Sequence, residues 1–306
     1  MNEVYYVTIS QAQADQRLDN YLLRILKGVP KSHIYRIIRS GEIRVNKKRA
    51  KPKMRLQADD VIRIPPVRVS AEKTHHIGSG LSACLQQSIL FEDERLLVIN
   101  KPTGIAVHAG SGLSVGVIEG LRAVRSDLVY LELAHRIDKA TSGCLVLVKD
   151  RGTLRALQAL FVEKTINKTY WALLTNAWHD KKTVVVDAKL RKNIVKSGER
   201  MVCVDAMGKA SQTTFHLLKN AAQACWVEAR PTTGRTHQIR VHSAHLGHPI
   251  LGDSKYGVIA GIPEIKKRLY LHARSIQFNL DGHDFSFEAE PDASFLQALD
   301  LLQLRE

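Results

Sequence analysis

The sequence predicts an α+β protein with two domains, a small basic one followed by a larger one. Its 306 residues suit about two domains of average length. Helix-like and strand-like apolar spacings both occur along it, and positive charge gathers in its first quarter. The composition, 44% hydrophobic and 25% charged, excludes collagen-like, coiled-coil and mostly disordered chains. We expect an N-terminal segment at residues 1–14, a first domain at 15–66, an aperiodic linker at 67–84 and a second domain at 85–306.

Two helices are expected at the start of the first domain. Between residues 17 and 27 the apolar side chains recur at the spacing of one helix face, and Asp15 is the expected N-cap. A second helix is expected to begin after Ser32 as N-cap and to end at Gly41. The apolar positions are Leu18, Tyr21, Leu22, Ile25 and Leu26 in the first helix and Ile34, Ile37 and Ile38 in the second.

Short strands are expected to follow the helices. Ile43 and Val45 alternate with Arg44 before a turn at residues 46–47. A last strand is expected at residues 61–64.

The charge points to a polyanionic partner. Lys and Arg outnumber Asp and Glu by 45 to 30, and the first 70 residues alone hold 15 basic and 6 acidic side chains. A concentrated basic patch favours nucleic acid as the partner. The alternative is an excess of lysine that only aids solubility.

The first domain resembles an S4 RNA-binding domain. The segments RLDNYL, SHIYRIIRSGEIRVN, AKP and DDVIRI match its pattern over about residues 15–66. The resemblance implies that the second helix and the following loop bind structured RNA through its shape and phosphates. A basic, solvated helix hairpin is the alternative. The expected RNA contacts are Lys31, Arg36, Arg39, Lys47, Lys48, Arg49, Lys51 and Lys53.

The second domain places a polar loop between two apolar runs, at residues 129–133 and 144–148, after an earlier strand at 96–99. The loop contains Asp138. From the residues alone, Asp138 is best explained as a turn former whose side chain bonds the backbone of Thr141 or Ser142.

Four segments of the second domain resemble the RluA family of pseudouridine synthases. They are NKPTGIAVH, HRIDKATSG, KTINKTYWALL and GRTHQIRVHSAHLGHPILGDSKYG, and the likeness spans about residues 88–290. GSGLSVGVIEGLRA and LRKNIVKSGER look most like the C subgroup of its large-subunit ribosomal RNA enzymes. The resemblance implies a catalytic domain with a mixed, mostly antiparallel sheet.

The same resemblance implies the reaction and the partner. Several uridines of 23S ribosomal RNA, or of its precursor particle, would be isomerised to pseudouridine, including some around the peptidyl-transferase centre. The reaction is an isomerisation in which the nucleoside gains and loses no atoms overall, so no cofactor or metal is expected. Two alternatives stay open: a non-catalytic ribosome assembly factor, and a family member that acts on tRNA.

Residue roles also follow from the resemblance. It makes Asp138 the catalytic carboxylate, Arg240 the cation that keeps it ionised, and Tyr170 the ring that stacks on the extruded base. Arg136 would fill the vacancy left in the RNA. Without the resemblance, Tyr170 would be a core residue and Arg240 a helix-surface arginine bonded to phosphate.

Further RNA contacts are expected from the same domain. They are Lys192, within the basic loop at 189–200, and Arg235. The alternative for that loop is a solvated hairpin tip.

Whether Asp138 adds to the nucleoside or removes a sugar proton is not fixed by residue identity.

A metal-dependent hydrolase is the remaining rival, because His237, His242, His245 and His248 lie close in sequence. Only His242 and His245 share the face of a helix expected at residues 236–246, capped by Thr236, and no HExxH glutamate accompanies them.

The four cysteines are far apart, and no apolar run is long enough for a membrane span. We therefore expect a soluble, cytoplasmic monomer with reduced thiols and no metal.

Overall fold

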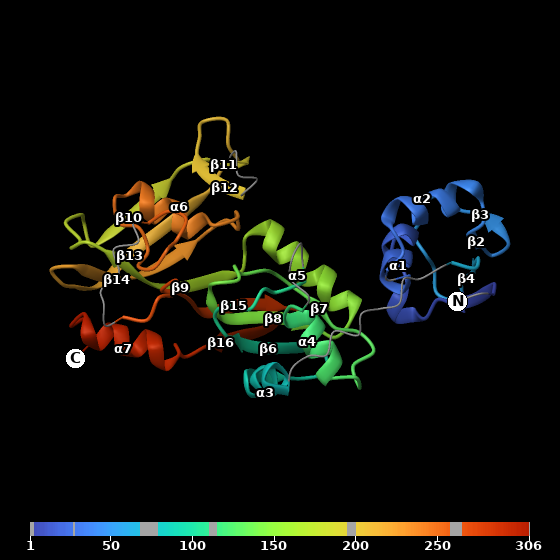
Figure 1. Cartoon of the computed structure of the whole chain (residues 1–306), viewed down its shortest axis with the longest axis horizontal. Helices are drawn as coiled ribbons and strands as arrows, with labels where there is room; N and C mark the ends of the chain where they lie inside the picture. The colour runs from blue at the N-terminus through green and yellow to red at the C-terminus, as the bar shows by residue number, and fades with distance from the viewer. Residues whose placement is uncertain are drawn as a thin grey trace. The chain divides into compact units, whose positions relative to one another are not determined.

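The computed structural model describes residues 3–26, 28–67, 79–109, 115–194, 200–257 and 265–305. It divides into two compact units, Met1–His76 and Ile77–Glu306 (Figure 1). Most of the expected linker, residues 68–78, lies outside the described residues. Its last part is not linker, because helix α3 (Ser79–Gln87) begins there and packs on α4 (Val117–Val124) of the larger unit.

The first unit has a four-stranded antiparallel sheet in the order β1-β4-β2-β3. Its elements are β1 (Tyr5–Thr8), the 3₁₀ helix η1 (Gln11–Gln13), α1 (Leu18–Ile25), α2 (Lys31–Ser40), β2 (Arg44–Val45), β3 (Lys48–Arg49) and β4 (Val61–Ile64). The expected N-terminal segment is therefore part of this unit, since β1 pairs along its whole length with β4.

Both helices begin elsewhere than the sequence predicts. The N-cap of α1 is Arg17, not Asp15, which has a left-handed φ of 60°. The N-cap of α2 is Pro30, not Ser32, so the helix starts earlier than a capping hydroxyl would place it. The end of α2 is as expected: Gly41 has φ +80°, the left-handed conformation that closes a helix.

The strand expectations for this unit hold. Asn46 and Lys47 both have positive φ, 51° and 66°, and form the tight turn between β2 and β3. The apolar residues expected inside, from Leu18 in α1 to Ile64 in β4, are buried in one core or pack against it.

The larger unit is built on a mixed, mostly antiparallel sheet, as the sequence predicts. Within the described residues its order is β10-β13-β14-β9-β15-β8-β6-β5, with β16 beside β15 and β7 beside β8, and only β8 and β15 pair in parallel. The strands are β5 (Ile89–Glu92), β6 (Leu96–Lys101), β7 (Glu132–Leu133), β8 (Ser142–Val148), β9 (Asn167–Thr175), β10 (Thr183–Asp187), β13 (Gln212–Asn220), β14 (Ala224–Pro231), β15 (Leu271–Leu280) and β16 (His283–Glu288).

A hairpin and three further helices complete the larger unit. Strands β11 (Leu190–Ile194) and β12 (Arg200–Val204) form the separate hairpin. The helices are α5 (Arg151–Glu163), α6 (Gln238–His245) and α7 (Ala293–Leu301). The chain between β11 and β12, residues 195–199, which includes most of the expected basic loop's tip, lies outside the described residues.

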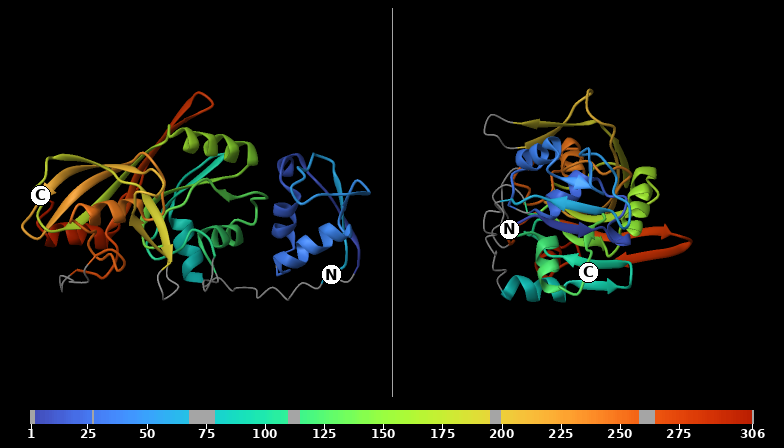
Figure 2. Two further views of the ribbon diagram at one scale, coloured as in Figure 1. Left: turned by 90° about the horizontal axis from the view of Figure 1, so that it is seen from above. Right: turned by 90° about the vertical axis from the view of Figure 1, so that its right-hand side faces the viewer.

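Helices cover both faces of the sheet at β6 and β8. Successive side chains of a strand point to opposite faces, so Leu96 and Val98 pack in the cluster that includes α5, and Leu97 and Ile99 in the cluster that includes α3 and α4. Figure 2 shows α5 and α3 on opposite sides of these strands. Burial on both faces explains why these strands read as unbroken apolar runs.

Two expected elements are shorter in the structure. Of the strand expected at 129–133 only β7 forms, since Glu132 and Leu133 alone pair with β8, and Val129 is 92% exposed. The helix expected at 236–246 is α6, whose N-cap is His237 rather than Thr236.

None of the described helices is long and apolar enough to cross a membrane. All four cysteines are free thiols.

Candidate active site

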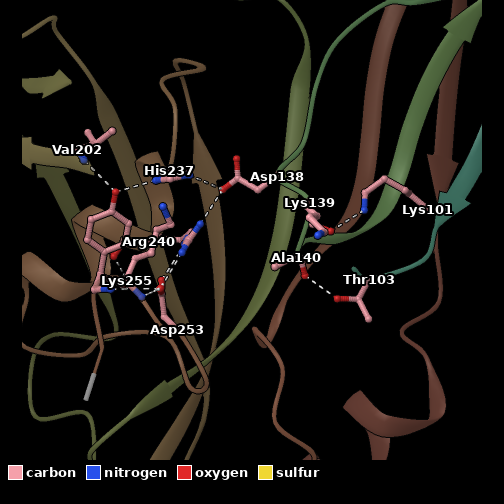
Figure 3. A network of polar contacts seen from close by, with 12 residues as sticks. Lys101, Thr103, Asp138, Lys139, Ala140, Val202, His237, Arg240, Asp253 and Lys255 are labelled. Atoms are coloured by element: carbon pink, nitrogen blue, oxygen red, sulfur yellow. Dashed lines mark hydrogen bonds and ion pairs between the residues drawn. The ribbon is translucent and has the colours of Figure 1, made fainter. Parts of the chain in front are cut away.

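The loop between β7 and β8 presents Asp138 (Figure 3). Its turn is closed by the Thr141 N–H, which donates to the backbone oxygen of Asp138 at 3.1 Å. The Thr103 hydroxyl donates to the Ala140 carbonyl at 2.7 Å and pins the loop to the end of β6. Because the turn uses the backbone oxygen, the Asp138 carboxylate is left for other partners, and the turn-former interpretation of that side chain is wrong.

Lys101, the last residue of β6, supports the same loop from inside. Its side chain is fully buried, and its Nζ donates to the carbonyls of Pro102, Ile105 and Lys139 at 2.8, 2.8 and 3.2 Å. Burial lowers the pKa of Lys101 to about 7, although the negative charge of Asp138 acts in the opposite direction. The loop that carries Asp138 is therefore fixed by buried polar contacts.

Arg240 on α6 faces Asp138. Its Nη1 lies 3.3 Å from Asp138 Oδ2, and its Nε and Nη2 donate to the two oxygens of Asp253 at 2.8 and 2.7 Å. Only 6% of the Arg240 side chain is exposed. The helix-surface interpretation of Arg240 is wrong, and the structure brings together two residues that are 102 positions apart.

The two carboxylates beside Arg240 differ in access. Asp253 is fully enclosed and also accepts the backbone N–H groups of Lys255 and Tyr256 at 2.9 and 3.2 Å. Burial alone would raise the pKa of Asp253, but Arg240 and these N–H groups outweigh it and lower the pKa. Asp138 keeps 28% of its side chain exposed and has the looser contact with Arg240. Asp253 thus holds the guanidinium in place, and Asp138 is the carboxylate that another molecule can reach.

His237 approaches Asp138 beside Arg240. Its Nε2 lies 3.8 Å from Asp138 Oδ2, and its Nδ1 lies 2.7 Å from the Tyr256 hydroxyl (Figure 3). Burial lowers the pKa of His237, so the neutral ring is favoured at neutral pH. From the sequence, His237 was considered only as a metal ligand, and Asp253 and Tyr256 were not singled out, although both belong to the GDSKYG segment that carries the family resemblance.

Local contacts give His237 its unusual backbone. The preceding loop is clamped by the buried Gln238, whose Oε1 accepts from the Thr233 hydroxyl and the Arg235 N–H at 2.7 and 3.0 Å. His237 itself has a left-handed φ of 54° at the start of α6. The clamp and the left-handed residue turn the chain into α6 so that His237 and Arg240 face the same loop.

Tyr170 lies on β9 in register with the Asp138 loop. It pairs with Ala273 of β15, which pairs in turn with Gly143 of β8. Gly143 has φ +109°, and a Cβ there would lie 2.2 Å from the Ala273 oxygen, so only glycine lets β8 approach β15 this closely. Burial raises the pKa of Tyr170, and the charge of Asp138 raises it further. The Tyr170 phenol is therefore neutral at ordinary pH.

The histidines near α6 do not form a metal centre. His242 is buried, with its ring nitrogens 2.9 Å from the Thr213 hydroxyl and 3.2 Å from the Ser211 hydroxyl. Across the described ranges, no group of three or more His, Cys, Asp and Glu side chains could hold a metal ion.

Comparisons with known proteins identify the family of this chain. The sequence pattern of the RNA pseudouridylate synthase family matches residues 95–245, and that of the S4 domain matches residues 16–62. Ribosomal large subunit pseudouridine synthase C of Pasteurella multocida is 52% identical over 281 residues, which are 90% of this chain and 86% of the relative. The chain belongs to the RNA pseudouridylate synthase family.

Two further comparisons support the membership of this RNA pseudouridine synthase in the family. The protein named ribosomal large subunit pseudouridine synthase C in Escherichia coli is 48% identical over 287 residues, 91% of this chain and 90% of the relative. The solved structure of the human protein named RNA pseudouridylate synthase domain containing 4 matches with a TM-score of 0.61 at 26% identity. The match covers 73% of this chain and 96% of the human chain.

The enzyme's expected RNA contacts are all at the surface. Arg136 is exposed two residues before Asp138, Lys192 is exposed on β11, and Arg235 is exposed with its Nε donating to the Ala210 carbonyl at 3.0 Å. In the first unit the expected contacts are also exposed: Lys31, Arg36, Arg39, Lys47, Lys48, Arg49, Lys51 and Lys53. Arg49 is partly engaged, because it donates to the Ser40 carbonyl at 2.8 Å.

Proposed function

We propose that this RNA pseudouridine synthase isomerises several uridines of large-subunit ribosomal RNA, including some around the peptidyl-transferase centre, with Asp138 as the catalytic carboxylate. The observation that carries the proposal is the accessible Asp138 carboxylate 3.3 Å from a guanidinium that a second, enclosed carboxylate holds in place. The relatives that match over most of the chain are named for large-subunit RNA, which supports the choice of substrate.

Asp138 has the surroundings that the chemistry needs. Breaking the N1–C1′ bond of a uridine and rejoining the base through C5 requires a carboxylate that stays ionised in a partly desolvated place. Arg240 supplies the opposing charge at 3.3 Å, and Asp253 keeps that charge oriented. The fixed loop between β7 and β8 holds the carboxylate without depending on substrate.

Tyr170 and Arg136 are the proposed contacts to the displaced nucleoside and to the gap it leaves. A uridine must leave its stack to reach Asp138, which costs a few kcal/mol. The neutral phenol of Tyr170 offers a flat face for stacking, worth about 1–3 kcal/mol per base. The exposed Arg136 can occupy the gap in the RNA, and together the two contacts offset much of the cost.

The exposed basic side chains of the S4 unit are the proposed means of holding the RNA. Eight of them lie on α2, the β2–β3 turn, β3 and the segment after it. Such contacts neutralise phosphates and carry little base readout, so they set affinity and leave the choice of uridine to the larger unit.

The proposal is tested by mapping carbodiimide-modified pseudouridines in RNA from cells with and without the gene. We expect defined large-subunit positions to lose pseudouridine, and to regain it with the wild-type gene but not with Asp138→Asn. Asp281→Asn, a change of the same chemistry at an aspartate 61% exposed, serves as the control and restores every position. Loss of pseudouridine only in tRNA, or an unchanged map, would contradict the proposal.

A further inference from the structure

Tyr256 links three parts of the larger unit that are distant in sequence. Its hydroxyl accepts the backbone N–H of Val202 on β12 at 3.0 Å and contacts His237 Nδ1 at 2.7 Å. Its ring also lies under the Arg240 guanidinium, 5.2 Å from ring centroid to Cζ. One side chain therefore touches the β11–β12 hairpin, the residue that caps α6 and the cation beside Asp138.

The contact with the hairpin is more than one hydrogen bond. Leu190 of β11, Val202 of β12 and Val241 of α6 form a small buried cluster, and Tyr256 packs against it. Val202 lies opposite Lys192 in the β11–β12 ladder, and Lys192 is an exposed side chain expected to contact RNA. The hairpin is thus fixed to α6 through Leu190, Val202 and Tyr256.

The hydrogen bonds at the Tyr256 hydroxyl suit the His237 tautomer that carries its proton on Nε2. The Val202 N–H occupies one lone pair of the hydroxyl oxygen, and the hydroxyl proton can be donated to His237 Nδ1. A neutral imidazole that accepts at Nδ1 carries its proton on Nε2, which is the atom that faces Asp138. The 3.8 Å separation is long for a hydrogen bond, and catalytic contacts are often long before substrate binds.

We propose that Tyr256 is a positioning residue for the isomerisation: anchored by the hairpin strand β12, it holds His237 so that Nε2–H faces the Asp138 carboxylate. This inference rests on the proposed catalytic role of Asp138. Arg240 and His237 then approach the same carboxylate oxygen, Oδ2, and the proposal assigns Oδ1 to the nucleoside.

Tyr256→Phe tests the proposal, because it removes both hydroxyl contacts and keeps the ring under Arg240. The full-length enzyme is assayed under single-turnover conditions by tritium release from RNA labelled at C5 of uridine, and RNA binding is measured separately by filter retention. We expect the rate constant at saturating enzyme to fall about tenfold, as for the loss of one orienting hydrogen bond, with an unchanged Kd.

Tyr270→Phe is the matched control. Tyr270 is also buried, its hydroxyl donates to the Lys266 carbonyl at 2.9 Å, and its ring lies 5.5 Å from the Arg268 guanidinium carbon. The Tyr270→Phe variant removes a buried tyrosine hydroxyl beside an arginine, as Tyr256→Phe does. Tyr270 does not contact Asp138 or His237, so this variant should leave the rate constant unchanged.

A second variant separates positioning from folding. His237→Asn preserves the Tyr256–Val202 hydrogen bond, and asparagine tolerates the left-handed backbone at this position. If Tyr256 acts through His237, the double variant is no slower than the slower single variant. A folded Tyr256→Phe enzyme within twofold of wild type, or single effects that multiply in the double variant, would overturn the proposal.

The two proposals fail in different ways. If Asp138→Asn is inactive and Tyr256→Phe is as fast as wild type, only the positioning role is wrong. If Asp138→Asn releases tritium at the wild-type rate, the proposed function is wrong as well.

Discussion

Replacing Arg240 by Met gives the largest expected loss of stability at the site. The change removes the guanidinium bound by Asp253 at 2.7 and 2.8 Å and keeps an apolar stem of similar length. The two side chains are 6% and 0% exposed, so Asp253 is left as a buried charge without its cation. Removing one partner of a buried pair costs about 3–5 kcal/mol, which is the fall we expect in the free energy of unfolding at pH 7.

The loss of unfolding free energy in Arg240→Met should be larger at neutral pH than at acidic pH. In the wild type the pKa of Asp253 lies below its ordinary 3.8, because Arg240 and backbone N–H groups outweigh burial, so this carboxylate adds stability above pH 3.8. In the variant burial is no longer opposed by the cation and raises the pKa of Asp253. The destabilisation is then greatest at neutral pH and shrinks as the pH falls through the raised pKa toward 4.

Urea unfolding followed by tryptophan fluorescence measures this change, since Trp171, Trp178 and Trp226 all lie in the larger unit. The control is Arg230→Met, which removes a partner of Glu228 at the same 2.7 Å but with 67% of the arginine exposed. An exposed pair contributes about 0–1 kcal/mol. An Arg240→Met protein within about 1 kcal/mol of wild type at pH 7, or a deficit that stays constant down to pH 4, would refute the reasoning.

Three further changes test other parts of the structure. Because the pKa of Lys101 is about 7 in the folded protein and 10.5 in the unfolded chain, unfolding free energy should rise from pH 7 to 9 by at most ~1.4 kcal/mol per pH unit, and Lys101→Met should remove this rise in urea titrations. Gly143→Ala, which places a Cβ 2.2 Å from a backbone oxygen, should lower the thermal midpoint far more than Gly282→Ala, where φ is also positive but the space is open; equal effects would contradict the close approach of β8 and β15. Replacing Lys47 and Lys48 by Ser should reduce the slope of log K against log salt for RNA binding by about 1.4–1.8, and an unchanged slope would exclude phosphate contacts at these exposed positions.

Elements governed by local patterns could be predicted from the sequence. The end of α2 follows from Gly41, and the β2–β3 turn from Asn46 and Lys47, because each depends on backbone conformations that these residues adopt easily. The apolar runs at β6 and β8 also identified their strands, since both are buried on two faces.

Elements that depend on distant partners were missed or misplaced. Strand β1 has an ordinary sequence and forms because β4, more than 50 residues later, pairs with it. The starts of α1 and α2 were misplaced because Asp15 and Ser32 satisfy the local capping rule, whereas the actual N-caps, Arg17 and Pro30, form no side-chain cap.

The residues of the site likewise depend on partners that are distant in the sequence. Asp138 and Arg240 could be paired only through the family resemblance, because no periodicity connects residues so far apart. Asp253 and Tyr256 act through contacts that form only when the chain after α6 folds back beside it. Lys101 was overlooked because lysine is almost never fully buried, and only the structure shows the three carbonyls that enclose its ammonium group.

The most direct test of the central claim compares Asp138→Asn with wild type in multiple-turnover tritium release from large-subunit ribosomal RNA labelled at C5 of uridine. The substitution keeps the size of the side chain and removes its charge. The account predicts no release above background, together with wild-type RNA affinity and an unchanged unfolding transition. Tritium release at the wild-type rate from the purified Asp138→Asn enzyme would show that the reacting group lies elsewhere.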